Sequence, residues 1–192
     1  CSAMSMKYLG KNVDIHTGGS DHIPIHHTNE IAQSEASTGK PFVNYWMHQN
    51  FLTFKGEKVS KSSGGLFTLS ELEEKGFLPM DYRYLLLGTQ YRNPVNFTIE
   101  NLTKAKESLE RLKNIISSLQ DDKKENKEYL QEFQKEINDD LNTPNALQVL
   151  WKLVRDEKAV GKINTIKKID EVLGLDLLKV EEVKISKKIS DL

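Results

Sequence analysis

The sequence predicts an α/β part followed by an all-α part. Between residues 12 and 54 lie short runs rich in β-branched and aromatic residues, and the first ends in paired glycines, a pattern typical of strands that lead into tight loops. From residue 101 onward, apolar residues recur at alternating three- and four-residue intervals, which indicates helices with one buried face. The two parts of the chain are therefore expected to differ in architecture.

Composition limits the classes of protein to which the chain can belong. Its 192 residues, 38% hydrophobic and 29% charged, suffice for the core of one domain and part of a second. The net charge of −1 gives no sign of nucleic-acid binding, although local patches could still bind RNA. Cys1 is the only cysteine, which excludes an intramolecular disulfide, and there is no signal peptide or long apolar run. A reduced, cytoplasmic setting without a membrane partner is expected.

The segment "NVDIHTGGSD", residues 12–21, predicts the first strand and the loop after it. In open parallel sheets, ligands bind beyond the carboxyl ends of the strands, where glycines let the backbone approach them. Gly18, Gly19 and Asp21 are therefore candidate nucleotide-binding residues, although two glycines more often mark a simple turn. The segment "FVNYWMHQNFLTF", residues 42–54, predicts one or two further strands.

A helix is predicted between Pro24 and Gly39, and it carries a candidate metal site. His26 and Glu30 lie one turn apart on the same face, close enough for one ion to bridge them. Together with Cys1 they would supply three ligands of a zinc site. An HxxxE spacing alone is more often a surface ion pair, and a lone cysteine is more often a buried apolar residue, so these alternatives stay open at this point.

The segment "GEKVSKSSGG", residues 56–65, packs lysines and serines between glycines. Lys58 and Lys61 could place two ammonium groups on a polyphosphate, and serine and glycine N–H groups such as that of Ser60 could add neutral donors. Composition alone favours a solvated linker over such a phosphate-binding loop.

Six segments, taken in order, resemble a known family. They are "CSAMS", "DIHTGGSD", "HHTNEIAQSEASTGKPFVNYWMH", "GEKVSKS", "YRNPVNF" and "DDLNTP". Their order and spacing, from Cys1 to about Arg155, are similar to the cysteinyl-tRNA synthetases, which are class I aminoacyl-tRNA synthetases. The resemblance implies the C-terminal part of a Rossmann-like catalytic domain followed by a DALR-type helical bundle.

The resemblance also implies an activity and the residues that carry it. L-cysteine would be activated with ATP and Mg²⁺ to cysteinyl-adenylate and then transferred to tRNA(Cys) by a monomeric enzyme. The segment "KVSKS" aligns with the KMSKS signature, which would make Lys61 and Lys58 catalytic and Ser60 a further ATP contact. Gly18, Gly19 and Asp21 resemble the adenosine-binding loop. His16 resembles a residue near the cysteine pocket, with a strand-end histidine bonded to backbone as the alternative.

The family's zinc ligands are two cysteines, a histidine and a glutamate, of which the last three in chain order fall on Cys1, His26 and Glu30. Zinc would select the thiolate of cysteine over the hydroxyl of serine. The HIGH signature and the first zinc cysteine are expected upstream of Cys1, so the chain alone is expected to be inactive. The sequence departs from the family at Ile25, where a proline is usual, at His22, which is usually apolar, and at Val59, which is usually methionine.

The resemblance further implies the divisions of the chain: part of the catalytic domain in residues 1–66, a stem-contact connector in 67–100, a helical bundle in 101–175 and a polar tail in 176–192. The connector contains a capping box, Thr68 to Glu71, and a helix around residues 82–87. Helices are expected over residues 101–119, 130–141, from an N-cap at Thr143, and up to Gly174. Arg83, Tyr91 and Arg92 are candidate RNA contacts that fit ordinary surface or packing roles equally well.

Two other functional classes are compatible with parts of the sequence. A zinc-dependent hydrolase or deaminase could use Cys1, His26 and Glu30 with a bound water, although no arrangement such as HExxH follows. A non-enzymatic RNA-binding module could use only the helices and the lysine-containing loop.

Overall fold

The computed structural model describes residues 1–54, 57–58 and 67–179. The chain forms two compact units. The first unit contains residues 1–66 and 89–98, and the second, here called the helical unit, contains residues 67–88 and 99–192. Among the described residues, none of the helices combines the length and apolar character needed to cross a bilayer.

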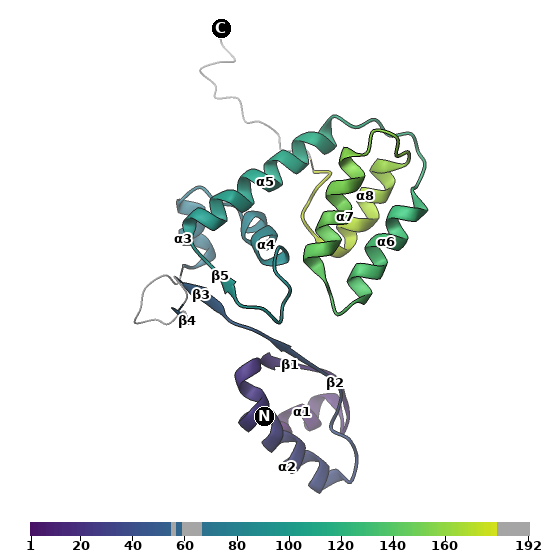
Figure 1. Cartoon of the computed structure of the whole chain (residues 1–192). Helices are drawn as coiled ribbons and strands as arrows, with labels where there is room; N and C mark the ends of the chain where they lie inside the picture. The colour runs from purple at the N-terminus through teal and green to yellow at the C-terminus, as the bar shows by residue number, and fades with distance from the viewer. Residues whose placement is uncertain (55–56, 59–66, 180–192) are drawn as a thin grey trace. The chain divides into compact units, whose positions relative to one another are not determined.

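The first unit contains two small sheets (Figure 1). Strands β1 (Val13–Gly19) and β2 (Val43–Gln49) are parallel, with Val13 opposite Val43 and Gly19 opposite Gln49. Strand β3 (Leu52–Phe54) pairs antiparallel with β4 (Glu57–Lys58) and parallel with β5 (Val95–Asn96). The predicted strands in residues 12–21 and 42–54 are thereby confirmed.

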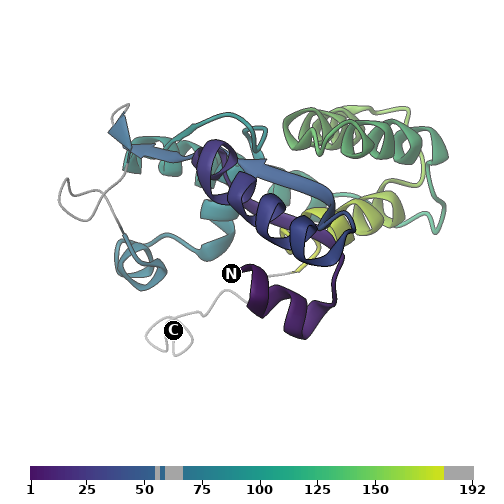
Figure 2. The ribbon, with the colours of Figure 1, turned by 90° about the horizontal axis from the view of Figure 1, so that it is seen from below.

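Two helices accompany the parallel strands: α1 (Ser2–Leu9) and α2 (Thr28–Thr38). In Figure 2, α2 runs alongside β1 and β2. The alternation of strand side chains explains this placement, because His16 and Trp46 point to the face that α2 covers, whereas Ile15 and Tyr45 are 62% and 72% exposed on the other. The α2-facing side of the sheet is therefore the one that can hold a buried site.

The predicted helix between Pro24 and Gly39 is confirmed, but its entry is unusual. A short 3₁₀ turn (Ser20–His22) leads into a π-helical turn (Ile23–His27) that contains Pro24 and runs directly into α2. The Thr28 hydroxyl donates to the Ile23 carbonyl oxygen at 2.6 Å within this turn. A π turn widens the helix by one residue and often occurs at functional sites, and this turn carries His26 and His27 at its end.

The helical unit consists of six helices in its described part. They are α3 (Leu69–Glu74), α4 (Pro79–Leu87), α5 (Ile99–Ser117), α6 (Lys127–Asn138), α7 (Thr143–Arg155) and α8 (Lys162–Leu173). The apolar faces of α4 to α8 meet in one core, whose fully buried members include Leu112, Leu150, Leu153, Ile166 and Ile169. The helices predicted from apolar spacing, and the Thr68–Glu71 capping box, are confirmed.

Two local predictions about helix ends are wrong. The N-cap of α7 is Asn142, whose side-chain oxygen accepts from the Asn145 N–H, and Thr143 is the first helical residue. Helix α6 ends at Asn138 rather than near Leu141, which adopts a left-handed backbone with φ 54°. The first difference arises because the Asn142 side chain satisfies a free N–H group of α7 from one residue earlier.

The boundaries of the units differ from the predicted segments in two places. Residues 67–100 do not stay together, because 67–88 pack with the helices and 89–98 with the first unit, where β5 pairs with β3. The predicted tail from residue 176 does not begin as a polar extension, because Leu177 is only 3% exposed in the helical core. The Asp170 carboxylate accepts from the N–H groups of Leu175 and Leu177 and folds this segment back.

The backbone at Gly161 gives a stability prediction for the helical unit. Gly161 has φ 73°, and a Cβ there would lie 2.6 Å from the carbonyl carbon of Glu125. Gly161→Ala should therefore lower the free energy of unfolding by about 1–2 kcal/mol through left-handed strain and by about 1–3 kcal/mol more through the clash. Gly76→Ala is the matched control, since φ is 84° but nothing lies within 4 Å of the new Cβ. Urea titrations followed by circular dichroism that gave equal losses would contradict the packing at Gly161.

Candidate functional site

All five histidines of the chain lie in one cluster in the first unit. His27 is at its centre, and the ring centroids of the other four lie 4.7–5.6 Å from that of His27. These neighbours, here called the histidine cluster together with His27, are His16 on β1, His22 and His26 in the turns before α2, and His48 on β2. Parallel pairing of β1 with β2 and the π turn bring these segments together.

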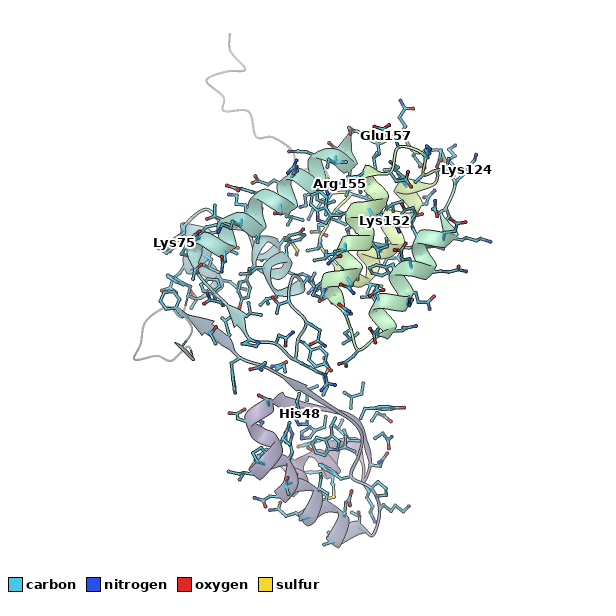
Figure 3. The ribbon with its side chains drawn as sticks, viewed as in Figure 1. His48, Lys75, Lys124, Lys152, Arg155 and Glu157 are labelled. Carbon is cyan, nitrogen blue, oxygen red and sulfur yellow. The ribbon has the colours of Figure 1, made fainter. Side chains whose placement is uncertain are left out.

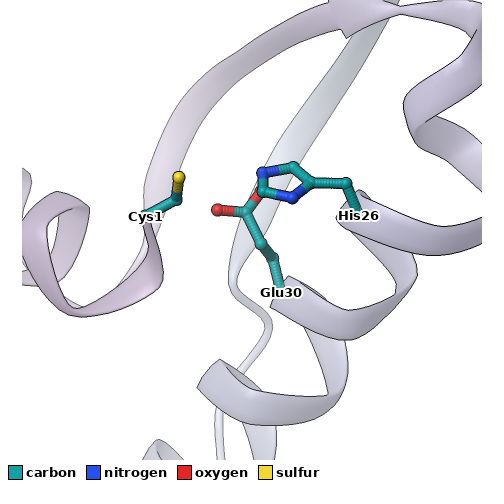
Figure 4. A group of neighbouring side chains, drawn as sticks. All are labelled: Cys1, His26 and Glu30. Atoms are coloured by element: carbon teal, nitrogen blue, oxygen red, sulfur yellow. The ribbon is translucent and has the colours of Figure 1, made fainter.

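Cys1, His26 and Glu30 converge at one side of this cluster (Figure 4). A thiol sulfur, an imidazole nitrogen and a carboxylate oxygen from the three side chains all lie within 4.8 Å of one another. Cys1 caps the start of α1, His26 belongs to the π turn, and Glu30 lies in the first turn of α2. The structure therefore brings together the three side chains that the sequence predicts as metal ligands.

The Glu30 carboxylate is the unusual member of this group because it is only 3% exposed. Its Oε2 accepts a hydrogen bond from Nε2 of His16 at 2.7 Å, and Nε2 of His26 lies 3.8 Å from the same oxygen. Its Oε1 is buried and has no hydrogen-bond partner among the described residues. A buried carboxylate oxygen without a partner is costly, and a cation beside it would remove that cost.

The donor set fits a zinc ion. Thiolate sulfur, imidazole nitrogen and carboxylate oxygen are the three ligand types that zinc takes in proteins. A second group, His16, His27 and Glu30, also has ligand atoms within 4.8 Å of one another. Its nitrogens already have partners, because His16 bonds Glu30 and Nδ1 of His27 lies 2.7 Å from Nε2 of His48. The group with Cys1 is therefore the better candidate metal site.

The alternative interpretation of His16, a strand-end histidine bonded to the backbone, does not match its contacts. His16 Nε2 donates to a carboxylate, and its ring packs edge-on against Trp46 with centroids 5.0 Å apart. His16 thus orients Glu30 from the neighbouring strand, as partners behind a metal ligand commonly do.

Electrostatics favour the neutral form in the inner part of the cluster. Burial lowers the pKa of His27, and the neighbouring His16 and His48 lower it further. Burial also lowers the pKa of His48, with the Arg92 guanidinium as the next cause. Only one proton fits between Nδ1 of His27 and Nε2 of His48, so one ring donates to the other while the pair is neutral.

The two glycines predicted to bind nucleotide are closely packed. A Cβ at Gly18 would lie 2.5 Å from Cε1 of His27, and one at Gly19 would lie 2.5 Å from Oδ1 of Asp21. The absence of a side chain at Gly18 lets the ring of His27 reach the strand end. Packing is thus one physical reason for glycine at this position, and the predicted contact with ATP stays a prediction.

Of the remaining predicted residues, only Arg92 is near the cluster within the described residues, close enough to lower the pKa of His48. Ser60 and Lys61 lie outside the described residues, and Lys58 is described only as the end of β4. The Arg83 guanidinium donates from Nε to the Leu173 carbonyl oxygen at 2.6 Å, where α8 ends. The Arg92 guanidinium lies over the Tyr91 ring at 5.1 Å, and the carbonyl oxygens of both residues accept from Asn50.

Sequence reasoning missed His27, His48 and Trp46. His27 precedes α2, while Trp46 and His48 alternate on one face of β2, and their rings are parallel within 4°. The signal that would have found them is strand register, because His16 is opposite Trp46 and Gly18 is opposite His48 in the parallel pair. The sequence shows the alternation but not the register.

Comparisons with known proteins all match the chain to class I tRNA synthetases. The family model "tRNA synthetases class I (C) catalytic domain" matches residues 1–107, and the model "DALR domain" matches residues 132–178. Among curated relatives, cysteine–tRNA ligase 1 of Burkholderia lata is 46% identical over 179 residues, covering 92% of this chain and 38% of the relative. The cysteine–tRNA ligase of Treponema denticola is 39% identical over 206 residues, covering 93% of this chain and 42% of the relative. The chain spans about two fifths of the length of these relatives.

Solved structures agree at the level of the fold. A leucyl-tRNA synthetase from Agrobacterium radiobacter K84, in a ternary complex with tRNA, matches 84% of this chain and 26% of its own, with a TM-score of 0.62 and 17% identity. Methionyl-tRNA synthetase from Mycobacterium tuberculosis matches 89% of this chain and 36% of its own, with a TM-score of 0.53 and 16% identity. The predicted fold, part of a Rossmann-like class I catalytic domain with a DALR-type helical bundle, is confirmed, and neither the hydrolase nor the RNA-binding module is favoured.

The histidine pair gives a prediction about pH. Because the pKa of His48 in the folded chain lies below 6.5, its neutral form is favoured, and stability of the first unit should fall as pH drops below 6.5 toward the folded-state pKa. Arg92→Gln should raise the pKa of His48, since one nearby positive charge is removed. Lys11→Gln, the same change of charge elsewhere in the first unit, should leave that pKa unchanged. Imidazole NMR titrations of the metal-free chain in which both variants behave alike would contradict this electrostatic account.

Proposed function

Because the chain belongs to the class I (C) tRNA synthetase catalytic-domain family, we propose that the protein containing it is a cysteine–tRNA ligase. The enzyme activates L-cysteine with ATP and Mg²⁺ to cysteinyl-adenylate and transfers the cysteinyl group to tRNA(Cys). The observation that carries this proposal is the convergence of Cys1, His26 and Glu30. A class I fold with a thiolate, an imidazole and a carboxylate at one point suits a thiol-bearing amino acid.

The proposed selection of cysteine depends on these three side chains. Zinc, when bound, supplies a soft Lewis-acid position that favours the thiolate of cysteine over the hydroxyl of serine. The chain's own contribution is to hold the ligands in place: His16 donates from Nε2 to one oxygen of Glu30, which leaves Oε1 available. Discrimination between cysteine and serine through one strong bond to the thiolate can be large enough that no separate editing of the wrong product is needed.

The proposed activation step uses the loop after β4 and the end of β1. Lys61, with Lys58 and Ser60, would stabilise the negative charge on the phosphates while the cysteine carboxylate attacks the α-phosphorus and pyrophosphate leaves. Gly18 and Gly19 would let the backbone approach the adenosine, and Asp21 would accept from its ribose hydroxyls. Positioning and charge stabilisation, rather than covalent chemistry by the protein, would account for the rate.

We extend the proposal to the organisation of the enzyme. Residues 1–66 would form part of the catalytic domain and 101–175 the anticodon-side bundle, and the stem-contact connector over 67–100 would be divided between the two units. The enzyme would act as a cytoplasmic monomer. The direct test is cysteine-dependent ATP–pyrophosphate exchange and charging of tRNA(Cys) by the complete protein, and the absence of both would refute the proposal.

Zinc binding gives the first prediction for the complete enzyme. Glu30→Ala removes a buried ligand and should weaken zinc binding by more than the roughly 10–100-fold typical of changes behind the ligands. The preference for cysteine over serine in pyrophosphate exchange should fall with it. Glu35→Ala, on the same helix but outside the ligand group, should keep both properties. Full zinc content by metal analysis together with unchanged selectivity in the Glu30 variant would refute the assignment.

The second prediction for the complete enzyme concerns stabilisation of the negative charge on the ATP phosphates. Lys61→Ala should lower the rate of adenylate formation by about 10²–10³ and leave cysteine binding nearly unchanged. Lys40→Ala, an equal loss of charge at the end of α2, should have little effect. Single-turnover measurements of adenylate formation distinguish the two variants, and a normal rate for Lys61→Ala would remove this residue from the mechanism.

A further inference from the structure

A second group of possible metal ligands shares Glu30 with the candidate zinc site. One ligand atom from each of His16, His27 and Glu30 lies within 4.8 Å of the other two. His27 and Glu30 are each 3% exposed and His16 is half-buried, whereas Cys1 and His26 of the candidate zinc site are exposed. We therefore call His16, His27 and Glu30 the inner group.

The two carboxylate oxygens of Glu30 have different surroundings. Oε2 accepts the hydrogen bond from Nε2 of His16 at 2.7 Å, whereas Oε1 is buried without a hydrogen-bond partner among the described residues. In Figure 4 one of the two oxygens points toward the Cys1 sulfur. A carboxylate can bind a separate ion through each oxygen, and the ions of two-metal sites lie about 3.5–4 Å apart. With the proposed zinc on Oε1, Oε2 is left for a second ion beside the inner group.

Packing holds the two imidazoles of the inner group in place. The ring centroids of His16 and His27 are 4.7 Å apart, and those of His16 and His27 lie 5.0 Å and 4.8 Å from that of Trp46. Phe42, which is fully buried, lies edge-on to the His16 ring at 6.0 Å. Ligands whose conformations are fixed by such packing bind an ion without first having to be ordered.

His27 is oriented as metal-binding histidines commonly are. Its Nδ1 lies 2.7 Å from Nε2 of His48, which strand β2 supplies (Figure 3). A histidine that binds a metal usually forms a hydrogen bond through its other ring nitrogen, and this bond fixes the tautomer and the orientation of the ring. Nε2 of His27 has no hydrogen-bond partner within the part of the chain that the structure describes, so it is the nitrogen available to an ion.

The inner group needs only small movements to coordinate an ion. Bonds of about 2.0–2.2 Å at tetrahedral angles place two ligand atoms about 3.3–3.6 Å apart. The separation of 2.7 Å between His16 Nε2 and Glu30 Oε2 would therefore widen by about 0.6–0.9 Å. The His16 proton would move from Nε2 to Nδ1, and the hydrogen bond to Glu30 would be lost. Because of this loss, and because the group contains no thiolate, it is the weaker of the two sites.

We propose that the inner group binds a second divalent metal ion, for which Glu30 forms a bridge to the ion at Cys1 and His26. Two imidazoles and one carboxylate suit Zn²⁺ or Co²⁺, whereas Mg²⁺ and Ca²⁺ prefer oxygen ligands. The site with Cys1 fills first, and the inner group fills when the metal is in excess. This inference concerns metal binding alone, so a failure of the proposed ligase activity would leave it unchanged.

The test titrates Co²⁺ into the metal-free complete protein and follows its absorption. The first ion should give thiolate-to-cobalt charge-transfer absorption, and the second should add only the weaker visible bands of a site without sulfur. His27→Gln should weaken binding of the second ion by at least about tenfold and keep the charge-transfer absorption, which shows that the Cys1 site is still formed. His22→Gln is the matched control, because His22 belongs to the same cluster but to neither ligand group. It should bind the second ion as the unaltered protein does.

Electron paramagnetic resonance of the unaltered protein gives a check that needs no variant. Two Co²⁺ ions bridged by one carboxylate couple magnetically, so the signal of the first ion should weaken as the second ion binds. A second ion that leaves the first signal unchanged would overturn the shared bridge and with it the inference. Equal affinities for the second ion in His27→Gln and His22→Gln would also overturn it, as would a titration of the unaltered protein that ends with the thiolate-bound ion.

Discussion

The burial of the Glu30 carboxylate is the constraint on which the first unit depends. A carboxylate that is 3% exposed must be compensated locally, since an uncompensated buried charge destabilises a fold by several kcal/mol. Four segments take part: α2 carries the group, β1 supplies His16, the π turn supplies His26, and the start of α1 supplies Cys1. The small core of this unit, which includes Val13 and Phe42, is thereby organised around a polar centre.

The same centre connects two functions that the sequence presents as separate motifs. The glycine loop at the end of β1 and the HxxxE helix are different segments, yet Gly18 lies against the ring of His27. Any side chain at Gly18 would displace that ring, and the ring bonds His48 on the neighbouring strand. The end of β1, proposed to bind adenosine, and the ligand group of Cys1, His26 and Glu30, proposed to hold the zinc that binds cysteine, are therefore positioned by the same layer of histidine rings.

Local signals predicted most of the fold, and contacts between distant residues account for what they missed. Apolar spacing, a capping box and a glycine C-cap predicted the helices, because each depends on neighbours in sequence. The split of residues 67–100 was not predictable, because it depends on the pairing of Leu52 with Val95, which lie far apart in the sequence. Leu177 is buried because Asp170 captures its N–H. At the site, His16, His26 and Glu30 were predicted from motifs, whereas the contact of His27 with His48 required the strand register.

The division of the chain between the two units has a mechanical consequence. The polypeptide passes from one unit to the other after residue 66, returns after residue 88 and leaves again after residue 98. Segment 67–88 is fastened within the helical unit by Arg83 on the end of α8 and by Tyr84 on Trp151. Because these contacts hold segment 67–88 within the helical unit, a break of the chain on either side of this segment would leave it attached there.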